Sequence, residues 1–96
     1  MAIISFADDS VENFFYDGII PLRAGWARSS HQVLTKLDRL HMAARLLDMS
    51  FPPGNNLHRL EGSMNEYYSV RINKQWRLIF KWKDGNASAV NIVDYH

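Results

Sequence analysis

The stretch YYSVRINKQWRLIFKWKDGNASAVNIVD, residues 67–94, decides the fold because apolar and polar side chains alternate along it. We expect a strand over Tyr67–Ile72, a second strand that begins at Trp76, and a last strand from Ala87 to about Asp94. One face of the second strand is wholly apolar: Trp76, Leu78, Phe80 and Trp82. Lys83-Asp-Gly-Asn86 is a strong signal for a tight turn between the last two strands. The stretch therefore predicts an antiparallel set of three strands.

The residues before this stretch carry a helical pattern. The spacing of Ser29 and Gln32 is that of a capping box, so we expect a long helix over residues 30–48. Its apolar side chains recur at three and four residues: Val33, Leu34, Leu37, Leu40, Ala44 and Leu47. A shorter helix through Val11–Phe15 is expected after the capping candidates Asp8, Asp9 and Ser10, and a short first strand over Ile3–Phe6. Together these predict a single α+β domain over residues 1–96, with two N-terminal helices packed on a small, mainly antiparallel sheet.

Composition excludes several classes of protein. The chain has 96 residues, of which 47% are hydrophobic, as in ordinary globular domains. No apolar run approaches the roughly 18 residues that span a bilayer, and residues 1–6 lack the basic start of a signal peptide, so we expect a cytoplasmic protein. The absence of cysteine excludes disulfides, thiolate metal sites and a cysteine nucleophile. His31 and His41 have no recognisable zinc spacing, and no metal or cofactor is expected.

Positive charge gathers in one segment although the net charge is only +1. Residues 71–83 contain no acid and five cations: Arg71, Lys74, Arg77, Lys81 and Lys83. Such a segment could contact phosphate groups. It could also be a solvated sheet edge, where lysines deter aggregation. Charge alone favours the edge.

The turn also predicts which residues face one another across the last two strands. With a two-residue Asp-Gly loop, Arg77 faces Ile92, and Asp94 is its diagonal neighbour on the same face. His96 would continue that face and Tyr95 would point the other way. A guanidinium and a carboxylate so close could form a surface ion pair, typically contributing about 0–1 kcal/mol. They could equally be parts of a phosphate-handling site, and the pattern leaves both readings open.

Three stretches together resemble the RelE/HigB-type toxins of bacterial type II toxin–antitoxin systems, in the HigB or killer-protein branch. They are PPGNNLHRLEG (52–62), YYSVRINKQWRLIFKW (67–82) and NIVDYH (91–96). With the N-terminal helices, the resemblance covers nearly the whole chain. It implies a RelE-like, microbial-ribonuclease-type fold and an endoribonuclease that cleaves messenger RNA in the ribosomal A site. It also implies an antitoxin partner with a helix-turn-helix domain, operator DNA contacted only through that antitoxin, and no membrane partner.

The resemblance carries the family's functional positions to Arg77, Asp94, Tyr95 and His96. Metal-free RNA cleavage uses the substrate 2′-OH as nucleophile and needs a base, an acid and positive charge at phosphorus. His96 suits the base or the acid, because histidine titrates at about 6.5 in reference peptides. Tyr95 suits a donor or positioning group, and Arg77 suits charge stabilisation. Asp94 would orient His96 or Arg77, or act as the base.

Further cations would contact RNA or the ribosome: His58, Arg59, Arg71, Lys74 and Lys81. Glu61 departs from the family pattern, because this position is a lysine in some relatives. That departure supports an alternative, a weakly active or inactive homologue that acts mainly as an antitoxin-binding co-repressor. A further alternative is a free-standing RNA-binding domain that stacks bases on Trp76 or Trp82.

Overall fold

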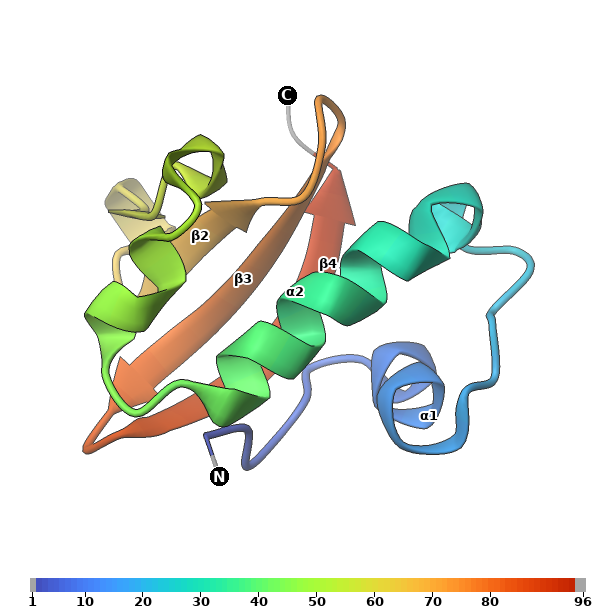
Figure 1. The fold of residues 1–96 in the computed structure, drawn as a ribbon, viewed down its shortest axis with the longest axis horizontal. Coiled ribbons are helices and arrows are strands. Elements are labelled where there is room, and N and C mark those ends of the chain that lie inside the picture. The colour runs from blue at the N-terminus through green and yellow to red at the C-terminus, as the bar shows by residue number, and fades with distance from the viewer. Residues whose placement is uncertain (1, 95–96) are drawn as a thin grey trace.

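The structure, a computed structural model, describes residues 2–94 and consists of a helical layer packed on one sheet (Figure 1). The helices are α1 (Asp9–Asp17) and α2 (Ser30–Met42), with short 3₁₀ helices η1 (Gly25–Ser29), η2 (Leu46–Ser50), η3 (Pro53–Asn55) and η4 (Gly62–Met64). The strands are β1 (His58–Arg59), β2 (Tyr67–Arg71), β3 (Trp76–Lys83) and β4 (Asn86–Asp94). They pair antiparallel in the order β1-β2-β3-β4. The predicted α+β fold is confirmed, and β1 is an addition that the sequence pattern did not predict.

The core lies between α2 and the sheet. Val33, Leu37 and Leu40 of α2 are fully buried, as are Leu78 and Phe80 of β3. The side chains of Trp76 and Trp82 are half-buried and pack against this cluster. A Cβ atom on Gly25 would lie 2.6 Å from the Trp76 ring, so only glycine permits this approach of η1. Both tryptophans therefore pack the core, and the base-stacking alternative finds no support.

The long helix is shorter than predicted. It ends at Met42 rather than residue 48, because Ala43 has an extended backbone with ψ of 130°. The Asp48 carboxylate accepts hydrogen bonds from the backbone N–H groups of Ala44 and Arg45, at 2.9 and 3.0 Å. These bonds supply an alternative to further helical turns, and Leu47 is consequently 66% exposed instead of buried.

The capping box at the start of α2 is also a wrong prediction. The Ser29 side chain makes no capping bond. Instead, Ser29 Oγ and Gln32 Oε1 both accept hydrogen bonds from Asn73 Nδ2, at 3.0 and 3.1 Å. These two residues therefore tie the start of α2 to the turn between β2 and β3.

The N-terminal segment runs along β4 without forming a regular strand. The predicted strand over Ile3–Phe6 is reduced to two isolated parallel bridges, Ile3 with Ala87 and Phe6 with Val90. Helix α1 then begins after Asp8, whose carboxylate accepts hydrogen bonds from Ser10. These bonds lower the pKa of Asp8, as expected for a carboxylate that caps a helix.

A bulge in β4 changes the predicted register. The Asp-Gly turn pairs Lys83 with Asn86 as expected, but the register shifts by one residue between Ile79 and Lys81. Ala89 occupies the bulge with a φ of +51°, and its N–H donates to Ser5 Oγ at 2.9 Å. Arg77 therefore lies opposite Val93, and Asp94 lies opposite Trp76. The prediction that Asp94 shares the face of Arg77 is wrong by this one residue.

Candidate functional site

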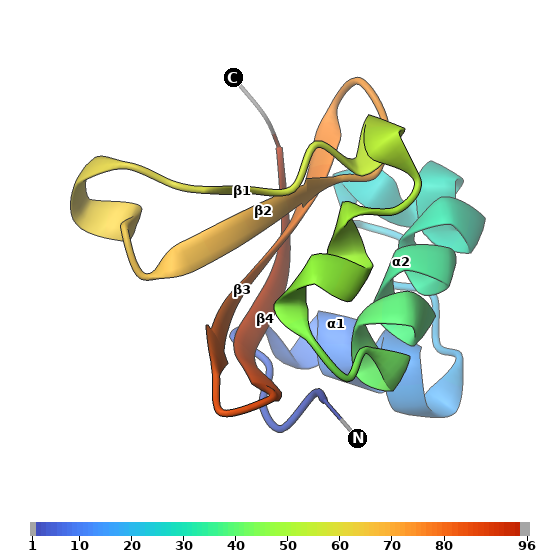
Figure 2. The same cartoon turned by 60° about the vertical axis from the view of Figure 1, so that its left-hand side comes forward.

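The face of the sheet turned away from α2, which we call the open face, carries a cross-strand pair of arginines. In Figure 2 the helices α1 and α2 both lie on one side of the sheet. Arg71 of β2 lies directly opposite Arg77 of β3, and Arg77 lies opposite Val93. Like charges directly opposite each other destabilise a sheet unless other groups stabilise them.

The two guanidinium groups converge on one backbone carbonyl. The Asn73 carbonyl oxygen accepts from Arg71 Nε at 3.3 Å and from Arg77 Nη1 at 2.6 Å. Arg77 Nη1 also donates to the Trp76 carbonyl, at 3.1 Å. This shared acceptor is a neutral carbonyl, which orients both guanidinium groups. Each guanidinium has five N–H donors in a planar fork that matches phosphate, so the pair is suited to an anionic ligand.

Asn73 organises this end of the sheet, although sequence reasoning did not single it out. Its Oδ1 accepts from the N–H groups of Gln75 and Trp76, both at 2.9 Å, which closes the β2–β3 turn. Its Nδ2 holds α2, and its carbonyl holds the two arginines. The available signal was an asparagine between two strand patterns, a residue that favours turns by bonding to its own backbone.

Asp94 lies at the same end of the sheet as this turn. It is exposed, and its Oδ2 accepts a hydrogen bond from Gln75 Nε2 at 3.1 Å. It stands one residue beyond the Arg77–Val93 pair, on the opposite face of the sheet. Tyr95 and His96, the other predicted catalytic residues, lie outside the described residues.

His58 is the second predicted binding residue on the open face. It lies opposite Ser69, which makes it a diagonal neighbour of Arg71. Its ring Nδ1 is 2.8 Å from the Asn56 carbonyl oxygen, and the side chain is exposed. His58, Arg71 and Arg77 thus share one face.

Arg59 and Lys81 lie elsewhere. They line a hollow of about 290 Å³ at the far end of the sheet, and Lys81 is four residues along β3 from Arg77, roughly 13 Å. Lys81 Nζ is 3.4 Å from a Glu66 carboxylate oxygen and 5.3 Å from the centre of the Tyr67 ring. The predicted RNA-binding set therefore divides between the open face, with His58 and Arg71, and this hollow, with Arg59 and Lys81. Lys74 lines a cleft beside α2, which Arg71 also lines.

Within residues 2–94, no three His, Asp or Glu side chains gather as a metal site would require. None of the described helices has the length and apolar character needed to cross a membrane. His41 has a structural position, with its ring against Phe15 and its Nδ1 3.4 Å from the N–H of Ile3.

Comparison with known proteins adds relatives and structural neighbours. A family model described as "RelE-like toxin of type II toxin-antitoxin system HigB" matches residues 4–96. The chain is 36% identical over 88 residues to Toxin HigB-1 of Vibrio cholerae, covering 88% of this chain and 87% of that protein. It is 29% identical over 66 residues to Endoribonuclease HigB of Proteus vulgaris, covering 62% and 72%.

Solved structures share the fold at lower identity. YafQ from Escherichia coli is 19% identical with a TM-score of 0.56, covering 96% of this chain and 90% of that one. The toxin chain matched in the YoeB–YefM complex from Staphylococcus aureus is 18% identical with a TM-score of 0.57, covering 100% and 97%. These two likenesses concern the arrangement of helices and strands.

Proposed function

We propose that this chain, which belongs to the family of RelE-like HigB toxins of type II toxin–antitoxin systems, is an endoribonuclease that cleaves messenger RNA in the ribosomal A site and so inhibits translation. Its relative in Proteus vulgaris is named an endoribonuclease. The observation that carries the proposal is the Arg71–Arg77 pair. It places two guanidinium groups on one carbonyl at the end of the sheet where Asp94 lies. RNA phosphate is an anion that such a pair would accommodate.

In the proposed reaction the substrate 2′-OH attacks the adjacent phosphorus. The 2′-oxygen–phosphorus bond forms as the bond to the 5′-oxygen breaks, leaving a cyclic phosphate and a 5′-hydroxyl end. One group accepts the 2′-OH proton and another donates a proton to the 5′-oxygen. His96 takes part in this proton exchange, and Tyr95 donates a hydrogen bond or positions the RNA. Arg77 stabilises the charge that develops on the phosphate oxygens.

The roles of two acids follow from where they lie. Asp94 is on the opposite face from Arg77 and accepts from Gln75, so we assign it to the carboxy-terminal pair, as orienting group for His96 or as the base. Glu61 is exposed in the segment before η4. A carboxylate near phosphate is repulsive unless paired, so Glu61 has no part in the proposed chemistry.

In this proposal the ribosome supplies RNA binding and substrate geometry that the toxin alone does not provide. The net charge of +1 gives little general attraction for free RNA. The ribosome would hold the messenger RNA in a bent geometry suited to in-line attack and contribute groups of its own. We expect purified protein to cut messenger RNA on translating ribosomes, and to cut the same RNA slowly or not at all when it is free. Rapid cleavage of naked RNA at physiological salt would contradict ribosome dependence.

Replacing Arg77 tests the charge-stabilising role. We expect Arg77→Ala to lower the cleavage rate at saturating ribosomes by about 10²–10³-fold, the usual loss of one transition-state donor. Arg77→Lys keeps the charge but loses the planar fork, so its cleavage rate should fall between those of the wild type and of Arg77→Ala. The matched control is Arg23→Ala, which removes an exposed arginine in the loop before η1. Equal losses in the Arg77→Ala and Arg23→Ala variants would exclude a specific role for Arg77.

The chain is a toxin with an antitoxin partner, as its family implies. We propose that this antitoxin carries a helix-turn-helix domain, that the pair contacts operator DNA only through it, and that the complex is cytoplasmic. Glu61, in place of a family lysine, favours a second candidate: a weakly active homologue that acts mainly as co-repressor. The two candidates differ in one observable, because a co-repressor would bind its antitoxin without arresting growth when produced alone.

A further inference from the structure

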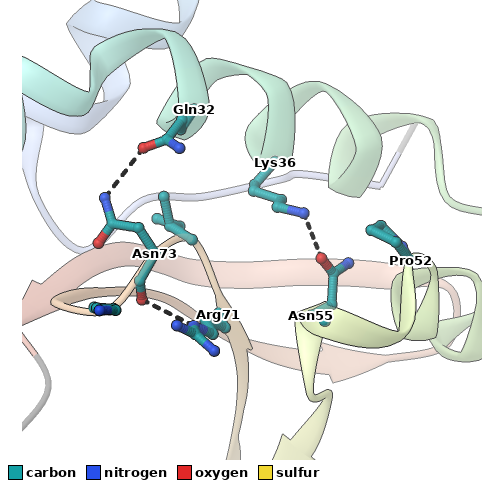
Figure 3. A pocket seen from close by; sticks show the side chains of 9 residues that line it. Gln32, Lys36, Pro52, Asn55, Arg71 and Asn73 are labelled. Carbon is teal, nitrogen blue, oxygen red and sulfur yellow. Dashed lines mark hydrogen bonds between the residues drawn. The ribbon is translucent and has the colours of Figure 1, made fainter.

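A cleft separate from the open face lies between α2, η3 and the β2–β3 turn. Its volume is about 400 Å³. Figure 3 shows Gln32 and Lys36 of α2 on one side, Asn55 of η3 on another, and Arg71 and Asn73 along the sheet. We call it the α2–turn cleft.

The amine of Lys36 is held in this cleft by a rigid partner. It donates a hydrogen bond to Asn55 Oδ1 (Figure 3). Asn55 is 1% exposed, and its Nδ2 donates to the carbonyls of Met49 and Phe51, at 3.1 and 2.8 Å. Because both amide hydrogens are used in this way, the oxygen is fixed toward Lys36. The side chain of Lys36 is therefore placed by a buried side chain instead of moving freely in solvent.

Among the described residues that line the cleft there are cations and no carboxylate. Three cations line it, Lys36, Arg71 and Lys74. Within residues 2–94 none of the three forms an ion pair with an acid. Burial, with a smaller contribution from Arg39, lowers the pKa of Lys36. A half-buried ammonium bonded to a neutral amide oxygen retains two further donors, and an anion would compensate its lost hydration.

We propose that the α2–turn cleft binds a backbone phosphate of RNA, with Lys36 as its central ligand and Arg71 and Lys74 beside it. The inference rests on the proposed function, since it names a contact of the toxin with the ribosome–messenger complex. Arg71 connects the two regions, because it lines the cleft and also shares the Asn73 carbonyl with Arg77. One RNA phosphate in the cleft would position another near Arg77. The phosphate comes from messenger RNA or from ribosomal RNA.

Binding measurements separate this contact from catalysis. We expect Lys36→Ala to weaken binding to ribosomes on the order of tenfold, the effect of one charge-assisted hydrogen bond. The slope of log affinity against log salt should become shallower by about 1. Lys36→Arg should restore most of the affinity. The matched control is Lys83→Ala, an exposed lysine that does not line this cleft.

Binding measurements with two kinds of ribosome identify the source of the phosphate. Equal weakening with empty ribosomes and with ribosomes that carry messenger RNA assigns the phosphate to ribosomal RNA. Weakening only when messenger RNA is present assigns it to the substrate strand. Lys74→Ala changes an exposed residue of the turn, so a smaller loss in the same direction supports the site even if Lys36→Ala perturbs folding.

Other outcomes overturn the proposal. Unchanged ribosome affinity and salt slope in both lysine variants would refute it. Loss of antitoxin binding with intact ribosome binding would assign the cleft to an acidic segment of the antitoxin instead. If the wild-type protein binds ribosomes but never cuts messenger RNA, the proposed function fails while the lysine effect on binding can still be measured.

Discussion

His96→Ala is expected to lower the rate of cleavage of ribosome-bound messenger RNA by about 10²–10⁴-fold, the usual contribution of a positioned acid or base. In the proposed mechanism this residue takes part in the proton exchange that accompanies attack by the 2′-OH. Alanine cannot exchange a proton, while Arg77 and the rest of the site remain. The rate should be measured in a single turnover at saturating protein, so that binding does not contribute.

Two comparisons make that result specific. The His96→Ala protein should bind its antitoxin and the ribosome as the wild type does, since the proposal assigns His96 to proton exchange and not to binding. His31→Ala removes an exposed histidine of α2 and should leave the saturated rate within about threefold of the wild type, as expected for a surface change away from the chemistry. A His96→Ala rate equal to that of His31→Ala would contradict the proposed role.

Phe80→Ala is expected to lower the free energy of unfolding by about 3–5 kcal/mol, the usual cost of deleting a buried ring. Phe80 is 0% exposed at the centre of β3, between the rings of Tyr68 and Trp82, whose centres are 6.2 and 6.4 Å away. Domains of this size typically have a free energy of unfolding of about 5–15 kcal/mol, so the substitution would remove a large part of it. Urea unfolding followed by fluorescence gives the difference.

The matched control for Phe80 is another large apolar residue. Leu22 is 87% exposed in the loop before η1, and Leu22→Ala should change the unfolding free energy by no more than about 0.5 kcal/mol. If Phe80→Ala cost as little as Leu22→Ala, the side chains between α2 and the sheet would not form the stabilising core described above.

The strands could be predicted because their signal is local. Alternation along Trp76–Lys83 and the Asp-Gly turn depend on neighbouring residues, and the structure agrees with both. The bulge at Ala89 could not be predicted in this way. It is fixed by Ser5, 84 residues earlier in the chain, and a single extra residue moves Asp94 to the other face of the sheet.

The wrong prediction of a capping box has the same long-range origin. Ser29 and Gln32 have the spacing of a capping box, yet both accept from Asn73, 44 and 41 residues away. The side-chain oxygens that would accept from nearby backbone N–H groups in a capping box accept here from a distant side-chain amide. The end of α2 depends on Asp48, whose bonds to Ala44 and Arg45 are local but indistinguishable by periodicity from a continuing helix.

Some features of the candidate site could be predicted from local sequence patterns, and others depend on tertiary contacts. The arginine on the open face of β3 could be predicted from strand alternation, whereas the shared carbonyl of Asn73 depends on the tertiary position of the turn. The Lys36–Asn55 pair joins residues 19 positions apart through a non-repetitive loop, so no periodic pattern could indicate it. The roles of Tyr95 and His96 rest on the family resemblance.

We propose that this toxin cuts messenger RNA during translation through its carboxy-terminal residues. The most direct measurement is to produce the protein in bacteria without its antitoxin and to map messenger RNA 5′ ends across the transcriptome, for the wild type and for His96→Ala. We expect new 5′ ends inside translated codons with the wild type, and none of them with His96→Ala. Identical 5′ ends with both proteins, or cuts as frequent in untranslated regions as in codons, would contradict it.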